Sequence, residues 1–199
     1  MTSVDEQKLI QLSLEGHVQS FNQLVEMHQD AVYSLTLRMV RNRAQAEDLT
    51  QDTFISAFRH LSSYRGGVFR AWLLRIARNA TYDHLRKVQR RPETSIDEDI
   101  ITFSNTFRSN NPGPDDWVLS GELGKILSKC LEGLSDDHRM AVVLVDIEGY
   151  QYDEAATIMG VSIGTVKSRL NRARARLRDC LQNHPEHLPP SMRLDSKEQ

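Results

Sequence analysis

Apolar residues recur at helical spacing along most of the chain and outline a series of amphipathic helices. The first apolar stripe runs from Phe21 to Met39, and a second ends at Leu61. A third helix starts near Phe69, because the motif "SSYRGG" (Ser62–Gly67) breaks the pattern just before it. This periodicity is typical of helices that bury one face. The second stripe consists of Ala46, Leu49, Ala57, Phe58 and Leu61, and the third of Phe69, Trp72, Leu73, Ile76 and Ala80.

The second half of the chain continues the pattern in shorter helices. Ser135 stands where an N-cap is expected, and Asp136 and Asp137 follow in the first turn, where the helix dipole favours acids. Gly149 ends this helix. Its buried stripe is Met140, Val143, Leu144 and Ile147.

A short helix and a turn come next, and their spacing matches a helix–turn–helix. Ala156 precedes Gly160 by four residues, and the apolar Val166 follows Gly160 by six. Glycine relieves the turn, and Ser162 is placed to cap the helix after it. The inward side chains of the short helix are Ala155, Ile158 and Met159. The predicted fold class is all-α.

The helix after the turn, "VSIGTVKSRLNRARARL" (Val161–Leu177), has three distinct faces. One narrow side is apolar and consists of Val166, Leu170, Ala173 and Leu177. The opposite side carries Gly164, Thr165, Ser168 and Arg172. The flanks carry Lys167, Arg169, Arg174 and Arg176. A helix that lies in the major groove presents short polar groups and an arginine to the base edges, and it presents cations on its flanks to the phosphates. The polar side and flanks of this helix therefore predict DNA binding.

Charge divides the chain more sharply than its formal net charge of −2 suggests. Residues 65–91 and 167–178 are strongly basic, whereas residues 93–122 are acidic and rich in Pro, Ser and Asn. Local basic blocks indicate a polyanionic partner, and a Pro-rich stretch without helical period indicates a linker. We therefore expect two small helical domains over residues 1–91 and 117–182. A flexible acidic linker over 92–116 joins them, and a disordered tail covers 183–199.

The helix that begins at Phe69 also suits nucleic acid on its polar side. That side offers Arg75, Arg78, Asn79 and Tyr82. Cations hold phosphates, aromatic rings stack on bases and amides read base edges. Phe69 and Trp72 are better explained as core residues, and Tyr64 in the glycine-flanked loop is the better stacking candidate.

An acidic patch lies on the polar side of the second helix. It consists of Glu47, Asp48, Gln51 and Asp52, which share one face at helical spacing. From these residues alone, both a solvated surface and a docking site for a basic partner remain possible.

Composition argues against several other classes of protein. No apolar run approaches the roughly 20 residues that span a bilayer, and "MTSVDEQKL" has no signal-peptide pattern, so we expect a cytoplasmic protein. Cys130 and Cys180 lack zinc-site spacing, and a disulfide is not expected in a reducing compartment, so we expect two free thiols. The seven histidines are scattered. The sequence shows no catalytic constellation, metal site or cofactor motif, so we do not expect an enzyme.

Three motifs together resemble the extracytoplasmic-function (ECF) sigma factors, group 4 of the sigma-70 family. They are "AEDLTQDTF" (Ala46–Phe54), "FRAWLLRIARN" (Phe69–Asn79) and the "VSIGTVKSRLNRARARL" segment, in that order. The similarity covers residues 15–91 and 117–182. It implies a region 2 domain that binds and melts the −10 promoter element and a region 4 domain that reads the −35 element.

The resemblance assigns roles to the residues of each domain. It implies −35 contacts from Ser162, Gly164, Thr165, Lys167, Ser168, Arg169, Arg172 and Arg176. It implies −10 contacts from Ser62, Ser63, Tyr64, Arg65, Gly66, Arg75, Arg78, Asn79 and Tyr82. It makes Glu47, Asp48, Gln51 and Asp52 the docking site for the β′ clamp helices. Only Gly67 and Val68 separate Arg65-Gly66 from Phe69, so the loop is a residue shorter than is common in the family.

The resemblance also implies the partners of the protein. These are core RNA polymerase, through the β′ clamp helices and the β flap, promoter DNA and an anti-sigma factor, with no membrane insertion of its own. Two alternatives are a helix–turn–helix repressor or activator that does not bind polymerase, and a protein that binds single-stranded RNA. Co-purification with core polymerase would distinguish a sigma factor from both alternatives, because only a sigma factor requires it.

Overall fold

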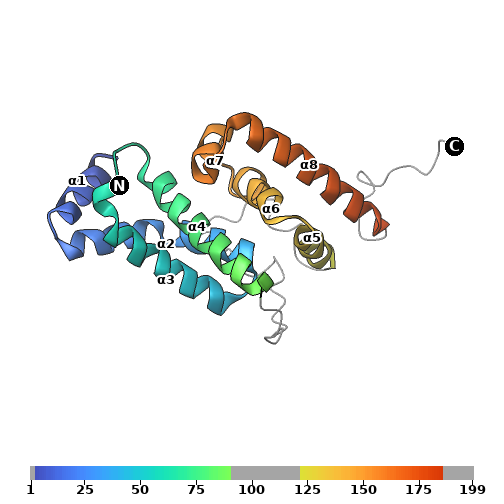
Figure 1. Cartoon of the computed structure of the whole chain (residues 1–199), viewed down its shortest axis with the longest axis horizontal. Coiled ribbons are helices and arrows are strands. Elements are labelled where there is room, and N and C mark those ends of the chain that lie inside the picture. The colour runs from blue at the N-terminus through green and yellow to red at the C-terminus, as the bar shows by residue number, and fades with distance from the viewer. Residues whose placement is uncertain (1–2, 91–121, 186–199) are drawn as a thin grey trace.

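The computed structural model describes residues 3–90 and 122–185, and these form two groups of helices that lie side by side (Figure 1). No strand occurs within these two ranges, so the predicted all-α class with two helical domains is confirmed. The predicted linker and tail lie almost wholly outside the described residues.

The first domain is built from four helices. α2 lies at its centre, in contact with α1, α3 and α4. The helices are α1 (Ser3–Leu14), α2 (Val18–Val40), α3 (Arg43–Arg59), the 3-10 turn η1 (Leu61–Ser63) and α4 (Phe69–Arg90). Asn42 caps α3, since its side chain accepts a hydrogen bond from the Gln45 backbone N–H at 3.0 Å.

The second domain places the long α8 across three shorter helices. Its elements are α5 (Glu122–Glu132), α6 (Asp136–Val142), the π-helical turn η4 (Val143–Ile147), α7 (Tyr152–Met159) and α8 (Ile163–Gln182). Gly160 ends α7 with a φ of 63°, and the Ser162 hydroxyl accepts from the Thr165 backbone N–H at 3.1 Å. The predicted helix–turn–helix, α7 and α8 with Gly160 in the turn, is therefore confirmed.

The predicted stripes form most of the core, with some corrections. Phe69, Leu73, Met140, Leu144, Val166 and Leu170 are all buried. Phe58 is 43% exposed, so its place in the buried stripe was wrong; its ring meets the edge of Phe21 at the surface instead. Ser135 does occupy the N-cap position of α6, but its hydroxyl bonds to the His138 ring at 2.8 Å rather than to the helix backbone.

Two helices were not predicted. α1 packs on α2, and His28 on α2 lies 2.7 Å from the Glu6 carboxylate of α1. α5 packs on α8 and buries Cys130, Leu131 and the following Leu134. None of the described helices combines the length and apolarity needed to cross a bilayer.

Contrary to the expectation of free thiols, Cys130 and Cys180 form a disulfide. The isolated positions of the two cysteines suggested no partner for either, but α5 lies against α8 and places their Cα atoms 5.8 Å apart. That separation is typical of disulfide-bonded pairs. The bond ties the first and last helices of the second domain together.

This disulfide closes a loop with a sequence separation of 50 residues. A cross-link over such a loop stabilises a fold by about 4 kcal/mol in the chain-entropy account. We expect the oxidised protein to melt at a higher temperature than the reduced protein. The Cys130→Ser/Cys180→Ser variant should melt like the reduced protein, with or without reductant. Equal melting temperatures for the oxidised and reduced wild type would contradict this.

Candidate nucleic-acid interface

The exposed face of α8 is the first part of the candidate interface. The apolar stripe is buried, with Val166, Leu170 and Ala173 each at most 1% exposed. Packing of this stripe on α6 and α7 turns the opposite face outward. The residues that face solvent there are Gly164, Lys167, Ser168, Asn171, Arg172 and Arg176. Of the four residues predicted for the base-reading side, Gly164, Ser168 and Arg172 therefore face solvent, whereas Thr165 is half-buried and its hydroxyl lies 2.9 Å from that of Ser162.

The cations of α8 differ in how strongly they are tied to their own domain. Arg169 donates to Asp137 on α6 at 2.5 Å, and Arg174 pairs with Asp146. Among the described residues, Arg172 and Arg176 make no ion pair, although both lie close enough to His138 to lower its pKa, together with burial, which is the larger cause. These two guanidinium groups are the ones most available to a polyanion.

The polar face of α4 is the second part of the candidate interface. Arg75 and Asn79 are exposed, whereas Arg78 and Tyr82 are half-buried. The Arg78 guanidinium donates to the Asn79 side-chain oxygen at 2.7 Å and lies 5.5 Å from the centre of the Tyr82 ring. Burial lowers the pKa of Arg78 and raises that of Tyr82. The predicted residues are thus brought together, but Arg78 and Tyr82 also reach the second domain.

The loop before α4 has an unusual backbone held by one tyrosine. Gly66 and Gly67 have φ values of 91° and 93°, which residues other than glycine rarely adopt. The Tyr64 hydroxyl donates to the Gly67 carbonyl at 2.6 Å, and its ring packs against Phe69 and Trp72. Phe69 is core as predicted, while Trp72 is only half-buried. Tyr64 is part of this aromatic cluster rather than a freely exposed stacking ring.

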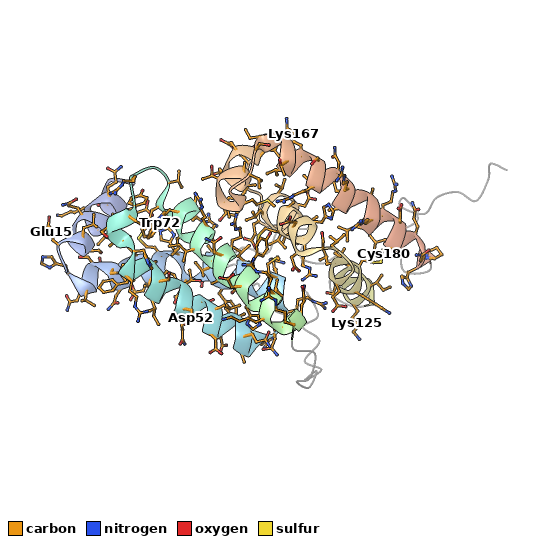
Figure 2. All side chains as sticks on the ribbon, in the orientation of Figure 1. Glu15, Asp52, Trp72, Lys125, Lys167 and Cys180 are labelled. Carbon is orange, nitrogen blue, oxygen red and sulfur yellow. A yellow bond between two sulfur atoms is a disulfide. The ribbon has the colours of Figure 1, made fainter. Side chains whose placement is uncertain are left out.

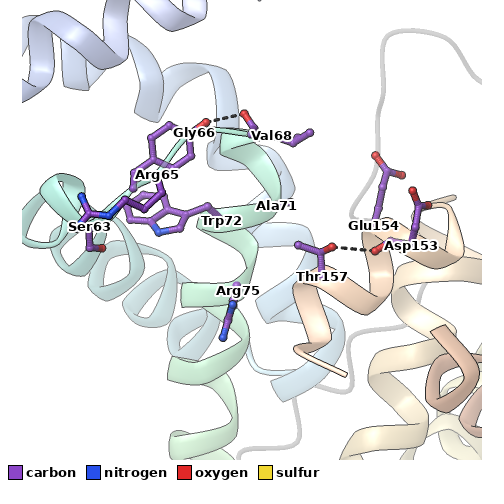
Figure 3. Close-up of a pocket in the computed structure, with 12 residues that line it drawn as sticks. Ser63, Arg65, Gly66, Val68, Ala71, Trp72, Arg75, Asp153, Glu154 and Thr157 are labelled. Carbon is purple, nitrogen blue, oxygen red and sulfur yellow. Dashed lines mark hydrogen bonds between the residues drawn. The ribbon is translucent and has the colours of Figure 1, made fainter. Parts of the chain in front are cut away.

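The same loop forms one wall of a cleft of about 560 Å³. Figure 3 shows Trp72 and Arg75 of α4 on the loop side and Asp153, Glu154 and Thr157 of α7 on the other. The cleft is therefore shared by the two domains. Among the described residues, no group of three or more His, Cys, Asp or Glu side chains is placed to hold a metal ion.

The acidic patch on α3 is fully available. Glu47, Asp48, Gln51 and Asp52 are all exposed, because Ala46, Leu49 and Thr53 hold the other face of the helix in the core. Figure 2 shows Asp52 on the outer side of the first domain. Ile55 and Phe58 continue this exposed face and are 48% and 43% exposed. This apolar extension was not predicted from the sequence, because Phe58 was expected in the buried stripe.

Sequence comparison places both domains in one family. The profile named "Sigma-70 region 2" matches residues 24–91, and that named "Sigma-70, region 4" matches residues 125–177. The "ECF RNA polymerase sigma-E factor" of Escherichia coli K12 is 39% identical over 175 residues, which cover 85% of this chain and 90% of that protein. The chain belongs to the ECF sigma factors of RNA polymerase. Its first domain is region 2 and its second is region 4.

Other relatives agree with this assignment. The "ECF RNA polymerase sigma factor SigE" of Mycolicibacterium smegmatis is 40% identical over 83% of this chain, which spans 63% of that longer protein. The sigma factor RpoE of Bartonella quintana, solved with the anti-sigma factor NepR, shares 32% identity over 82% of this chain and 97% of its own, with a TM-score of 0.61. CnrH, solved with the cytosolic domain of CnrY, shares 25% identity over 90% of this chain and 98% of its own, with a TM-score of 0.64.

The two unpaired arginines of α8 should affect promoter reading differently. Arg172 lies on the exposed face that is predicted to read bases, and a bidentate arginine–base contact discriminates by roughly 1–3 kcal/mol. Arg172→Ala should therefore lose affinity for the matched −35 duplex and much less for a mismatched one.

Arg176 flanks that face, so Arg176→Ala should weaken binding to all duplexes and reduce the slope of affinity against salt, as loss of a phosphate contact does. Fluorescence anisotropy over a salt series measures both variants. Equal losses on matched and mismatched duplexes for both variants would show that the two faces are wrongly assigned.

Proposed function

We propose that this chain is a group 4 ECF sigma factor that binds core RNA polymerase and directs it to promoters through a −35 and a −10 contact. Region 2 occupies residues 1–91 and region 4 occupies 117–182, joined by the linker 92–116 and followed by the tail 183–199. The observation that carries the proposal is the pair of exposed basic faces, on α4 and α8, in one chain with an exposed acidic patch on α3. The protein acts in the cytoplasm and catalyses no reaction by itself.

Region 4 reads the −35 element with α8. Ser162, Gly164, Thr165 and Ser168 lie at or near the amino end of the helix, where short side chains allow close approach to base edges. Arg172 reads a base in the groove. Lys167, Arg169 and Arg176 neutralise phosphates on its two walls, and Arg169 must leave Asp137 to do so.

Region 2 melts and holds the −10 element. The trap for an unstacked base is the loop Ser62–Gly66 with Asn79. Ser63 of the loop and Asn79 of α4 line one surface hollow together with Trp72. The open glycine backbone and the hydroxyls of Ser62 and Ser63 supply hydrogen bonds, and Arg65, Arg75, Arg78 and Tyr82 follow the strand. Trapping is required because unstacking costs a few kcal/mol per flipped base.

The acidic patch docks region 2 on the β′ clamp helices, and region 4 contacts the β flap. Exposed carboxylates at Glu47, Asp48 and Asp52 attract a basic surface, and the adjoining Ile55 and Phe58 supply apolar contact area. The two solved relatives were captured with NepR, an anti-sigma factor, and with the cytosolic domain of CnrY, which favours a regulator of that kind as a third partner.

Run-off transcription tests the proposed function directly. Core polymerase with this protein should produce a transcript from a promoter chosen from the protein's own genomic targets, and core polymerase alone should not. A helix–turn–helix repressor or activator would bind duplex DNA without core polymerase and would yield no transcript in this assay. Absence of transcript, together with failure to co-elute with core polymerase, would refute the proposal.

A charge reversal in the patch should separate polymerase binding from DNA binding. Glu47→Arg places a cation against a basic partner, so we expect the affinity for core polymerase to fall by about tenfold or more, since repulsive juxtaposition costs several kcal/mol. Binding of a −35 duplex should not change.

Glu26→Arg, on the exposed face of α2, is the matched control and should bind core polymerase normally. Size-exclusion co-elution and a competition titration measure these affinities. If both variants bind core polymerase as tightly as the wild type, the patch is only a solvated surface.

Asn79→Ala should impair promoter opening without impairing assembly. Asn79 is exposed, so its loss leaves the core of region 2 intact, but one amide contact to a flipped base disappears. Binding to core polymerase and to the −35 duplex should stay within about twofold of wild type, and the fraction of heparin-resistant open complex should fall several-fold. Asn22→Ala, an exposed asparagine on α2, is the matched control. Equal open-complex fractions for Asn79→Ala and Asn22→Ala would remove Asn79 from the trap.

A further inference from the structure

The middle of the exposed face of α8 carries short side chains only. Successive residues of a helix are about 100° apart, so four residues point away from the buried Val166 to within about 40°. They are Gly164, Ser168, Asn171 and Ala175. The first three are exposed and the last is half-buried, and α8 runs along the outer edge of the second domain (Figure 1). This row of short side chains lets another molecule approach the helix closely.

Asn171 differs from the rest of the row because its side chain ends in an amide. An amide has one acceptor oxygen and two N–H donors. Within residues 3–90 and 122–185, the Asn171 side chain has no hydrogen-bond partner. The Ser168 hydroxyl, three positions earlier, donates to the Thr165 backbone carbonyl at 3.0 Å and leaves the amide free. Both ends of this side chain are therefore available to a partner outside the chain.

The stability of α8 gives no reason for an asparagine at this position. Asn171 lies about two turns into a helix of 20 residues, so it caps neither end. Asparagine is also a poorer helix former than the lysine and the arginines at neighbouring exposed positions. Because Asn171 is exposed, it adds nothing to the core of the second domain either. A role in binding explains this residue better than a role in folding.

The amide of Asn171 is complementary to one base in particular. In the major groove adenine presents its N7 acceptor beside its N6 amino donor, and these match the two ends of an asparagine side chain. Guanine presents two acceptors there and suits the donors of an arginine such as Arg172. A phosphate is bound more strongly by a cation than by a neutral amide. Adenine is therefore the partner that this side chain fits best.

The position of Asn171 along α8 also suits a base contact. Eight residues separate it from Ile163, the first residue of the helix, which corresponds to about 12 Å of helix axis. This length is close to the width of the major groove. When the amino end of α8 enters the groove, the amide still lies between the two phosphate walls.

We propose that Asn171 reads one adenine of the −35 element, with its Nδ2–H group donating to adenine N7 and its Oδ1 accepting from the N6 amino group. This inference rests on the proposed function, which places α8 in the major groove. The short side chains of Gly164, Ser168 and Ala175 allow the helix to lie deep enough for the amide to reach the base. The −35 element read by this chain therefore contains an adenine close to the base that Arg172 contacts.

Selection from a randomised promoter locates the contacted base. Holoenzyme assembled from core polymerase and the full-length protein is mixed with duplexes of one of its own promoters, in which the −35 region is randomised. The bound duplexes are then sequenced. We expect the wild type to enrich adenine at one position by about tenfold, as a bidentate contact does. Asn171→Ala should lose the preference at that position and keep the preferences at all others.

A base analogue at the selected position shows whether the contact is direct. 7-Deazaadenine still pairs with thymine but lacks the N7 acceptor. Wild-type holoenzyme should bind the analogue duplex several-fold more weakly than the adenine duplex, whereas Asn171→Ala should bind both equally. Asn183→Ala changes an exposed asparagine at the carboxyl end of α8, so it is the matched control and should behave like the wild type.

The inference would be overturned by an unchanged base profile in Asn171→Ala, or by a loss spread evenly over all positions. An equal effect of 7-deazaadenine on the wild type and Asn171→Ala, or selection of another base at the affected position, would also overturn it. In each of these cases the wild type still selects a −35 sequence, so the sigma-factor function stands. A wild-type holoenzyme that selects no −35 sequence and yields no run-off transcript would refute that function, and the Asn171 contact with it.

Discussion

Each helix of the two small domains has only a narrow apolar stripe to bury, and the rest of its surface must face outward. Val166, Leu170 and Ala173 fix the rotation of α8, as Phe69, Leu73 and Ala77 fix that of α4. Once these stripes are buried, the arginines of both helices have no place except the opposite face. The basic surfaces that suit a polyanion thus follow from the packing of the core.

Acids of region 4 neutralise part of the positive charge of the free protein, although Arg172 and Arg176 make no ion pair among the described residues. Asp137 holds Arg169 and Tyr82, and Asp146 holds Arg174. These contacts involve partly exposed groups and are weak individually, so phosphates can replace them. The same side chains therefore stabilise the free protein and remain available for promoter DNA.

Much of the architecture was predictable because local periodicity determines it. The stripes of α2, α3, α4 and α8, the Ser162 cap and the turn at Gly160 all follow from residues near one another in sequence. α5 was missed although Leu127, Cys130 and Leu131 recur at helical spacing, so its signal was present in the chain. Phe58 also fits a helical stripe, but no neighbouring helix covers it, and a pattern within one helix cannot show that.

Contacts between distant segments were the part that the sequence did not reveal. The Cys130–Cys180 disulfide depends on how α5 lies on α8, and the partners of Arg78 and Glu148 depend on how region 4 lies on region 2. Likewise the sequence predicts Tyr64 as an exposed ring in a glycine-flanked loop, yet this ring packs on Phe69 and Trp72. Each of these results needs a pair of residues to be placed in space, whereas helical spacing places only one segment at a time.

We propose that the two basic faces act together on promoter DNA once polymerase holds the chain. Permanganate footprinting tests it most directly, because permanganate oxidises thymines only where the duplex is open. With core polymerase and this protein together, thymines at the −10 element should become reactive, and with either component alone they should not. Unreactive thymines in the complete complex, on a promoter to which the complex binds, would contradict the claim.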